Sequence, residues 1–488
     1  MTAKAPNSKA LSLVETAAFI DGLWIEGDST FDVTDPADGA VIAQVADLGA
    51  SETRVAIGAA HRALPTWAAK TAKERGAILR RWSDLMLAHA DDLARLMTAE
   101  QGKPLAESKG EVAYGAAFID WFADEAKRAY GHTIPTPMPG KRLASIKQPV
   151  GVCAAIAPWN FPIAMITRKV GPALAAGCTV VVKPAAETPL CALAIARLAV
   201  EAGVPAGVLN VITGKDSSAI GKALCEDSRV RKLSFTGSTP VGKILYEQCA
   251  GTMKKLSLEL GGNAPFIVFD DADLEAAVDG AIASKYRNTG QTCVCANRLI
   301  VQAGIHDAFV ARLAEKVAAM KVGPGTGEGV VIGPLINDKA LVKVEALVRE
   351  AVEGGAKVVT GGERHDLGGL FYQPTVLSGA TPDMRLFQEE IFGPVAPIVK
   401  FATEEQAIEL ANATPFGLAA YFYSRDVGRC WRVAEAIEAG MVGINEGLIS
   451  TEVAPFGGVK ESGLGREGAS EGLEEYLETK YLCFGGVG

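Results

Sequence analysis

The sequence predicts an α/β protein with two domains and a detached, strand-rich arm, and three observations support this prediction. Short apolar segments of strand character alternate with helical segments from residue 150 to 270. A second alternating series runs from 266 to about 445. Short apolar strands separated by helices indicate a parallel sheet covered on both faces, so each series predicts one such sheet. The strand-like segments 131–149 and 476–484 belong to neither series.

The segment before the first sheet is predicted to be helical. Apolar side chains recur at helical spacing through residues 51–130, for example at Ile78, Leu79, Trp82, Leu85 and Met86. A cluster of prolines and a glycine between 135 and 140 interrupts this pattern, and 141–147 follows as a candidate strand.

The two alternating series predict their elements in order. The first series contains strands at 150–156, 178–183, 208–212, 230–235 and 255–259. Its helices are expected from Phe161 to Ala176 and from Thr188 to Gly203, with Thr188 as the N-cap because Pro189 suits a first helical turn. The second series contains strands at 297–301, 356–360 and 395–399, and a helix at 307–320.

Composition excludes several classes of protein. The 488 residues are 49% hydrophobic and 22% charged, with a formal net charge of −9, which argues against nucleic acid and anionic membrane surfaces as partners. No run of about 18 apolar residues occurs, so no membrane span is expected. Nine cysteines without a CxxC pair predict no zinc site and suit a reducing, cytoplasmic location. The first fourteen residues lack a signal-peptide apolar run and are expected to form a short disordered tail.

Cys293 lies in the run RNTGQTCVCAN, residues 287–297. Gly290 and its polar neighbours predict a loop, where a thiol can be exposed in a cleft. Oxidation of an aldehyde to an acid can pass through attack by a thiolate, loss of hydride from the adduct to an acceptor, and hydrolysis of the resulting thioester. The alternative is a buried structural cysteine, the usual fate of this residue, and it is our interpretation of the other cysteines, with Cys295 a partial exception.

Two further polar residues fit the same chemistry. Glu259 ends a predicted strand before Gly261 and Gly262, where a carboxylate faces the ligand crevice of an α/β sheet; the alternative is a surface glutamate. Asn160, in PWNFP (158–162), lies at a strand-to-helix turn. Its side-chain N–H could stabilise an oxyanion beside the main-chain N–H of Cys293, or it could simply cap a helix.

The signals for a nucleotide cofactor are indirect. No GxGxxG follows a strand, so the standard dinucleotide fingerprint is absent. The segment 235–242, FTGSTPVG, follows a strand and opens a helix, where main-chain N–H groups can hold a phosphate.

Together, PWNFP, ELGG (259–262) and RNTGQTC resemble the aldehyde dehydrogenase superfamily over nearly the whole chain. The resemblance implies an aldehyde dehydrogenase-like fold: a Rossmann-type cofactor-binding domain (1–130 and 150–262), a catalytic domain (263–460), and a β-arm (131–149 and 461–488) that joins subunits of a homo-oligomer, a dimer or a tetramer. It implies that Cys293 is the nucleophile, Glu259 the base that activates water, and Asn160 the oxyanion donor. The implied contacts to NADP or NAD are Trp159, Asn160, Lys183, Pro184, Ala185, Ala186, Gly237, Ser238, Leu260, Glu390 and Phe392. Without the resemblance, Glu390 would be interpreted as a solvated charge and Phe392 as a core aromatic.

The substrate prediction rests on a closer likeness, to the succinate-semialdehyde dehydrogenases. It is carried by TRKVGPALAAG (167–177), CVC (293–295), EGLIS (446–450) and PFGGVKESGLGREG (455–468). It implies that Arg168, Arg287 and Ser450 bind the carboxylate of a small ω-carboxy aldehyde, for which arginine is suited because it can form two parallel hydrogen bonds. The alternative for each arginine is a structural role, in which it pairs with an acidic side chain of the protein.

The likeness leaves three alternatives open: glutarate semialdehyde as substrate, transfer of the thioester to coenzyme A, and a catalytically silent protein. One methylene gives only ~1–3 kcal/mol of discrimination between substrates. Glu259 argues against transfer to coenzyme A, and the intact set Cys293, Glu259 and Asn160 argues against a silent protein.

Two finer predictions concern the cofactor and Cys295. NAD-preferring relatives often carry Glu three residues after the lysine that matches Lys183; Ala186 stands there, which favours NADP, although Glu187 is adjacent. Cys295 is either a small apolar residue or, as in some succinate-semialdehyde dehydrogenases, the partner of Cys293 in a reversible redox switch. Residues two apart in an extended segment lie near the outer Cα limit for a disulfide, ~6.8 Å, so such a bond would be strained and easily reduced.

Overall fold

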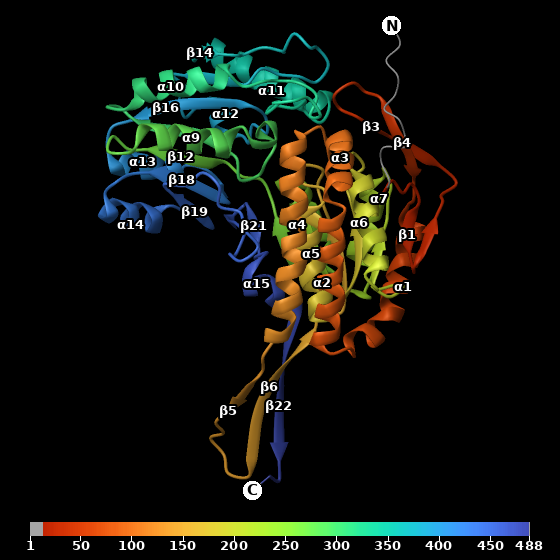
Figure 1. The fold of residues 1–488 in the computed structure, drawn as a ribbon. Coiled ribbons are helices and arrows are strands. Elements are labelled where there is room, and N and C mark those ends of the chain that lie inside the picture. Colours follow the sequence, from red (N-terminus) through yellow and green to blue (C-terminus); the bar gives the residue numbers. More distant parts are fainter. Residues whose placement is uncertain (1–12, 488) are drawn as a thin grey trace.

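Two α/β domains meet above a long β-arm in the computed structural model, which describes residues 13–487 (Figure 1). Each domain contains one predominantly parallel sheet, which confirms the predicted fold class. The predicted tail at residues 1–14 falls almost entirely outside the described residues.

The first sheet has the strand order β2-β1-β9-β8-β7-β10-β11-β21. Its five central strands are parallel, and their bounds are Leu209–Val211 (β9), Thr179–Lys183 (β8), Val152–Ile156 (β7), Val230–Thr236 (β10) and Lys255–Glu259 (β11). Three antiparallel strands flank them: Ala18–Ile20 (β1), which pairs with β9 and with the edge strand Leu23–Ile25 (β2), and Gly463–Leu464 (β21) at the other edge. All five predicted strands of this series are present, each within two residues of its predicted ends.

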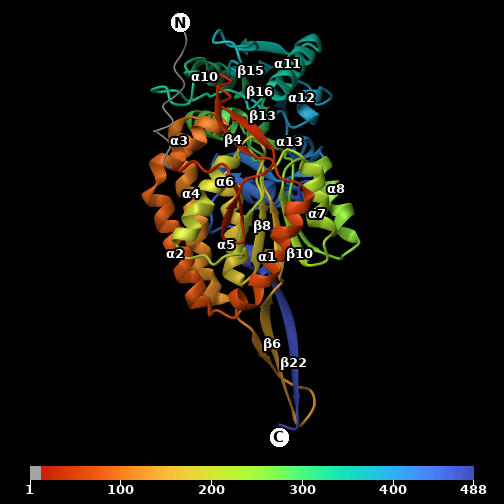
Figure 2. The same cartoon turned by 90° about the vertical axis from the view of Figure 1, so that its right-hand side faces the viewer.

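Helices cover both faces of the first sheet (Figure 2). They are α1 (Ala50–Ala68), α2 (Ala72–Ala88), α3 (Ala90–Gln101), α4 (Leu105–Glu125), α5 (Ala164–Ala176), α6 (Pro189–Glu201), α7 (Ser217–Glu226) and α8 (Thr239–Ala250). The predicted helix from Phe161 begins three residues later, at Ala164. Thr188 is the N-cap residue of α6, as predicted, but its side chain makes no capping hydrogen bond.

The second sheet has the order β14-β15-β16-β13-β12-β18-β19 and is parallel except for β14. Its strands are Lys357–Thr360 (β14), Thr375–Ser378 (β15), Val395–Phe401 (β16), Ala296–Gln302 (β13), Ala264–Val268 (β12), Ala419–Tyr423 (β18) and Met441–Ile444 (β19). Its helices are α9 (Leu274–Lys285), α10 (His306–Ala318), α11 (Asp338–Glu353), α12 (Arg385–Gln388), α13 (Glu404–Asn412) and α14 (Val427–Ala436).

The arm is a three-stranded antiparallel sheet in the order β22-β6-β5 that projects away from both domains (Figure 1). Its strands are His132–Ile134 (β5), Lys141–Pro149 (β6) and Leu477–Gly485 (β22). Within the segment 461–488 that was predicted for the arm, β21 pairs with β11 of the first sheet, and α15 (Ala469–Glu474) packs against α4 and α5. Of this segment, only β22 extends along the arm.

Short pieces complete the chain. Strands β3 (Thr30–Thr34) and β4 (Val41–Ala46) form a hairpin, and β17 (Phe416–Gly417) pairs with β20 (Val459–Lys460). In residues 13–487, no helix has the length and apolar composition needed to cross a bilayer.

Candidate active site

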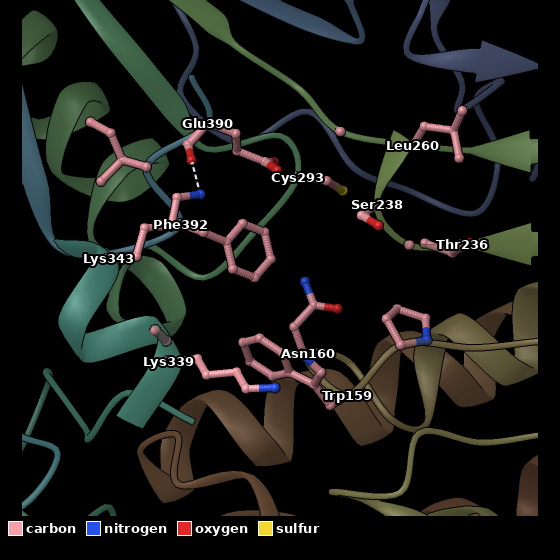
Figure 3. Close-up of a pocket in the computed structure, with 15 residues that line it drawn as sticks. Trp159, Asn160, Thr236, Ser238, Leu260, Cys293, Lys339, Lys343, Glu390 and Phe392 are labelled. Atoms are coloured by element: carbon pink, nitrogen blue, oxygen red, sulfur yellow. Dashed lines mark hydrogen bonds between the residues drawn. The ribbon is translucent and has the colours of Figure 1, made fainter. Parts of the chain in front are cut away.

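A cavity of about 500 Å³ lies between the two domains, beyond the carboxyl ends of β7, β10 and β11 (Figure 3). Loops at the carboxyl ends of parallel strands are where α/β sheets bind ligands. The first domain lines the cavity with Pro158, Trp159, Asn160, Thr236, Gly237, Ser238, Leu260 and Gly261. The second domain lines it with Cys293, Lys339, Ala340, Lys343, Glu390, Ile391 and Phe392.

Cys293 is partly buried and faces this cavity. The loop before it is tightly turned, because Asn288 (φ 50°), Thr289 (φ 58°) and Gly290 (φ 75°) are all left-handed. Non-glycine residues rarely adopt this conformation and need surrounding contacts to hold it. Here Asn288 donates to the carbonyls of Asn160 (3.0 Å) and Gln291 (3.3 Å). The loop is therefore held in one shape, with the thiol presented to the cavity.

The electrostatic surroundings keep the Cys293 thiol protonated. Burial, and next the Glu390 carboxylate, raise the pKa of Cys293 to about 12, with Glu259 adding to the effect. Arg168 and Arg287 act in the opposite direction. Four ionisable side chains therefore affect the thiol, and a base is needed to form the thiolate near neutral pH.

Asn160 points into the same cavity (Figure 3). Its side-chain Nδ2 donates to the Gln291 carbonyl at 3.0 Å, which orients the amide, and it does not cap α5. An amide nitrogen carries two protons, so the second remains for a ligand. The helix-capping alternative therefore does not describe this residue.

Glu259 ends β11 and is 3% exposed, so it is not a surface glutamate. Neither of its carboxylate oxygens has a hydrogen-bond partner within the described part of the chain. Burial, and next the charge of Glu467, raise the pKa of Glu259 well above its usual range. A buried carboxylate without partners binds a proton readily, as a general base requires.

Close packing explains why a glycine is needed after Glu259. A Cβ on Gly262 would lie 2.2 Å from the carbonyl oxygen of Cys293, so the two backbones approach too closely for any side chain. This contact brings the Glu259 strand and the Cys293 loop together. The glycines of the ELGG motif were predicted to permit such a close approach.

Arg168 is fully buried on α5 and forms an ion pair with an acidic side chain, which was the alternative to substrate binding. Its Nε lies 2.8 Å from Glu467, and its guanidinium stacks on the ring of Phe456 at 4.0 Å. Neither its Nε nor its Nη2 forms a hydrogen bond within residues 13–487, although the Nε is within ion-pair distance of Glu467. The ion pair thus holds the guanidinium and leaves donor groups unused.

Arg287 and Ser450 do not line the Cys293 cavity. The Arg287 guanidinium lies over the Phe161 ring at 5.5 Å, and the residue lines a second cavity of about 260 Å³ together with Glu107. Ser450 lines neither cavity; its neighbours Ile449 and Thr451 line a separate cavity of about 210 Å³. Arg168 and Arg287 thus lower the pKa of the Cys293 thiol, whereas no contact of Ser450 with the predicted substrate-binding arginines is seen in the described residues.

Several predicted cofactor residues line the same cavity as Cys293. Phe392, left-handed at φ 56°, packs edge-on against Trp159 at 5.5 Å and lines the cavity, so it is not a core aromatic. Glu390 accepts from the main-chain N–H of Gly262 at 3.3 Å, and burial raises its pKa to about 7, so it is not a freely solvated charge. Gly237 and Ser238 form the turn before α8, and Leu260 follows β11.

Lys183 ends β8, next to the loop that contains Pro184, Ala185 and Ala186. The Lys183 ammonium donates to the Ser217 hydroxyl at 2.8 Å. Burial lowers the pKa of Lys183 to about 8. Two hydrogen-bonding groups therefore lie together beyond the strand, and the Ala186 side chain is only a methyl group.

Cys295, in contrast, turns away from the cavity. Its thiol donates to the main-chain carbonyl of Lys285 at 3.1 Å, and the residue is 6% exposed. The Lys285 ammonium is buried beside it without a hydrogen-bond partner in the described residues.

Sequence reasoning missed several residues of this site. Lys339 and Lys343 on α11 line the large cavity, and Lys343 donates to the Glu390 carbonyl. The Tyr114 hydroxyl on α4 is buried without a partner in the part of the chain that the structure describes. Tyr114 packs on Phe118 at 4.9 Å, and Arg168 lies over the same ring at 5.1 Å. These residues belong to ordinary helical patterns, so no local signal marks them.

The fold and the site define the class of protein. The chain belongs to the aldehyde dehydrogenase family, whose profile matches residues 24–482. It is 60% identical to an NADP(+) succinate-semialdehyde dehydrogenase of Escherichia coli strain K12 over 97% of this chain and 98% of the relative. It is 59% identical to a glutarate-semialdehyde dehydrogenase of Pseudomonas aeruginosa strain PAO1 over 98% of this chain and 99% of the relative. A crystal structure of succinate-semialdehyde dehydrogenase from Burkholderia pseudomallei superimposes with a TM-score of 0.96 at 61% identity, covering 97% of this chain and 98% of that one.

No group of three or more metal-binding side chains occurs among the residues that the structure describes.

Proposed function

We propose that this enzyme oxidises succinate semialdehyde to succinate with NAD(P)+, and that NADP+ is preferred. The observation that carries the proposal is the set of unused donors near Cys293. Arg168 Nη2 and the Tyr114 hydroxyl are buried without partners within residues 13–487, and Arg287 also acts on the thiol. Buried donors without partners destabilise a protein unless a ligand satisfies them, and a substrate carboxylate would do so.

The distribution of charge supports an acidic substrate. Glu467 already neutralises part of the Arg168 charge and also pairs with Lys169. Despite burial, Lys169 and Arg168 hold the pKa of Glu467 below its usual range, so it stays charged. Arg287 forms no ion pair among the described residues, so its charge remains for the substrate.

The chemistry begins at the sulfur. The Cys293 thiol passes its proton, directly or through water, to Glu259, which releases it to solvent, and the thiolate forms a C–S bond to the aldehyde carbon. The carbonyl oxygen becomes an oxyanion, which accepts hydrogen bonds from the free Asn160 Nδ2 proton and from the Cys293 main-chain N–H. When bound, NAD(P)+ supplies the hydride acceptor, and the adduct becomes a thioester on Cys293.

Hydrolysis completes the cycle. Glu259 takes a proton from water as the water attacks the thioester carbon, and the C–S bond breaks to release the acid and the Cys293 thiolate. The raised pKa and unpartnered oxygens of Glu259 support this role. A base placed to activate water also argues against transfer of the acyl group to coenzyme A, and the intact set of groups argues against a silent protein.

The cavity is suited to a dinucleotide. The turn at Gly237 and Ser238 opens α8, where main-chain N–H groups can hold a pyrophosphate, and the Ser238 side chain is not used to cap the helix. Lys183 and Ser217 would donate to a ribose 2′-phosphate, and Ala186 carries no charge to repel it. The E. coli relative named for NADP(+) supports the same preference.

The arm supports a homo-oligomer, which we propose to be a dimer or a tetramer. Ile134, Ile146, Tyr481 and Phe484 on its three strands are exposed large hydrophobic side chains. Sedimentation at micromolar concentration should show no monomer, and a monomer alone would contradict this proposal.

A second substrate, glutarate semialdehyde, is favoured by the similarity to the P. aeruginosa relative. One methylene gives only ~1–3 kcal/mol of discrimination between substrates, so kinetic measurements must decide between the two semialdehydes. We would determine kcat/KM for aldehydes with three- to six-carbon chains, with and without the terminal carboxylate, using both cofactors and with or without coenzyme A. A maximum at succinate semialdehyde is expected, and equal values for acidic and neutral aldehydes would contradict the proposal.

A further inference from the structure

A turn between α3 and α4 links the two loops that carry Asn160 and Cys293. We call residues 101–103 the 101–103 turn. Gly102 is left-handed at φ 91°, and a Cβ there would lie 2.7 Å from Pro334 and 2.8 Å from Pro36. The turn is therefore closely packed, and its side chains have little freedom.

One end of the turn binds the Asn160 loop. The Lys103 ammonium donates to the main-chain carbonyl of Asn160 at 2.7 Å and lies over the Phe161 ring at 4.0 Å. The other end binds the Cys293 loop: Gln101 Nε2 donates to Asn288 Oδ1 at 3.0 Å, and its Oε1 accepts from the Lys103 main-chain N–H at 3.0 Å. The turn therefore holds the two loops in one fixed arrangement.

The Asn160 carbonyl is where these contacts meet. It accepts from Lys103 and also from Asn288 Nδ2. The Asn160 side chain donates to Gln291 of the same Cys293 loop. The main chain and the side chain of Asn160 are thus both fixed relative to the sulfur.

Glu111 completes the arrangement. Its Oε2 pairs with Lys103 at 2.6 Å, and its Oε1 accepts the main-chain N–H groups of Ile163 (2.9 Å) and Ala164 (3.2 Å) at the start of α5. Lys103 and Glu111 are 2% and 3% exposed. A buried ammonium is tolerated only when it is paired, and here the pair lies directly behind the oxyanion donor.

We propose that Lys103 is a positioning residue, whose hydrogen bond to the Asn160 carbonyl sets the alignment of Asn160 with Cys293 so that the amide and the thiol face the same carbonyl. This inference rests on the proposed role of Asn160. A misplacement of about 1 Å can slow a reaction by about 10²-fold, so a fixed alignment has a measurable effect. A purely structural ion pair would stabilise the fold without acting through Asn160.

The test isolates the contact between Lys103 and Asn160. Lys103→Met alone would leave Glu111 charged and buried, so the variant is Lys103→Met/Glu111→Gln, in which the Gln oxygen can still accept from the start of α5. Glu111→Gln alone is the matched control for the Lys103 contact with Asn160, which it keeps. It also leaves the buried ammonium without its ion pair, so the melting temperatures of both variants are measured beside their acylation rates. Acylation is measured without cofactor by the burst of p-nitrophenolate from p-nitrophenyl acetate, and thiol reactivity by the rate of iodoacetamide alkylation.

The expected result is selective. Glu111→Gln should acylate within about threefold of the parent, whereas Lys103→Met/Glu111→Gln should be slower by roughly ten- to a hundredfold. Alkylation needs no oxyanion donor, so its rate should change by less than about threefold in both variants. If Lys103→Met/Glu111→Gln does not fold, Lys103→Gln/Glu111→Gln replaces it, since its two amides can bond to each other while the shorter side chain leaves Asn160.

Asn160→Ala distinguishes a failure of the proposed oxyanion role of Asn160 from a failure of the positioning role of Lys103. If Lys103 acts through Asn160, adding Asn160→Ala to the double variant should slow acylation no further than Asn160→Ala alone. Full additivity, or equal rates for the double variant and its control, would overturn the positioning role. If Asn160→Ala by itself leaves acylation unchanged, the oxyanion role fails instead.

Discussion

The two sides of Cys293 differ in how far the protein satisfies its own polar groups. On the nucleotide side, which we define by Lys183, Glu390 and Lys343, each of these residues makes a hydrogen bond to another part of the chain. On the acid side, defined by Arg168, Arg287 and Tyr114, a guanidinium nitrogen and a hydroxyl are buried without partners in the described residues.

This difference indicates at which side of Cys293 the enzyme should select most strictly between ligands. A site whose polar groups are already satisfied gains little from any single ligand contact. A site with unpaired buried donors rejects ligands that cannot satisfy them, because those donors then stay unpaired. We therefore expect strict selection for the acid end of the substrate and milder selection between the two cofactors.

The largest effect should come from the residue between the two sides. Cys293→Ser should lower kcat by roughly three orders of magnitude or more, because a hydroxyl is far less ionised than a thiol. The nucleotide side does not depend on the sulfur, so the dissociation constant of NADP+, measured by calorimetry, should stay within about threefold of the parent value. Substantial residual turnover would remove Cys293 from its role.

Glu259→Gln should separate the two chemical steps. The hydride burst should remain, while steady-state turnover falls by about 10²–10⁴-fold, because water is no longer deprotonated. The pKa of Glu259 is raised, so parent turnover should increase as the pH rises through that value, and the variant should lose this dependence. Stopped-flow absorbance at several pH values measures both, and a lost burst with unchanged steady-state turnover would contradict the assignment.

Arg287→Ala tests the acid side directly. It removes a charge-assisted contact worth about 1.5–3 kcal/mol, so kcat/KM for succinate semialdehyde should fall by roughly ten- to a hundredfold. Propanal has no carboxylate and should be oxidised nearly as well as by the parent. Arg168→Ala should act in the same direction but also leave Glu467 without one partner, so its melting temperature serves as the control. Equal losses on both aldehydes would mean that the arginines are structural.

Ala186→Glu tests the milder selection on the nucleotide side. The parent should use NADP+ better than NAD+, and the added carboxylate should repel a 2′-phosphate and shift the ratio of kcat/KM values towards NAD+ by roughly tenfold. Ala186→Gln is the matched control, because it adds similar bulk without charge. A parent enzyme that favours NAD+ tenfold would contradict the preference.

The smallest effect on basal activity is expected for Cys295→Ala. Its thiol is buried and bonded to the Lys285 carbonyl, so forming a disulfide with Cys293 would require the side chain to turn towards the cavity. If the pair is a redox switch, mild peroxide should inactivate the parent reversibly, while the variant should not recover with a dithiol because Cys293 over-oxidises. Equal recovery of both proteins would leave Cys295 as a small apolar residue.

On each side of Cys293 the sequence named two of the three defining residues, Lys183 and Glu390 but not Lys343, and Arg168 and Arg287 but not Tyr114. Gly237, Gly262 and the loop around Asn160 work through main-chain geometry, and such turns require particular residues in short continuous motifs. Tyr114 and Lys103 act through long side chains from helices whose apolar spacing is ordinary. Their neighbours come from distant parts of the chain, so nothing nearby in the sequence marks them.

The same reasoning applies to the fold. Apolar strands such as β8 and β13 were predicted within two residues because burial on both faces gives continuous apolar runs. The short N-terminal strands β1 to β4 were not predicted; β1 and β2 have three residues each, too few to show a period. The order of strands in each sheet depends on contacts between distant segments and does not follow from local spacing.

The left-handed loop before Cys293 has a consequence for how the protein matures. Asn288 belongs to the second domain in sequence, yet its partners Gln101, Glu107 and Asn160 all come from the first domain. The second domain on its own keeps the contacts of Thr289 with Gly333 and of Asn288 with Gln291. It lacks the three contacts that fix Asn288 against the first domain, and these form only when the two domains dock. A chain whose domains have not docked would accordingly lack the fixed alignment of Asn160 with Cys293 on which the proposed chemistry depends.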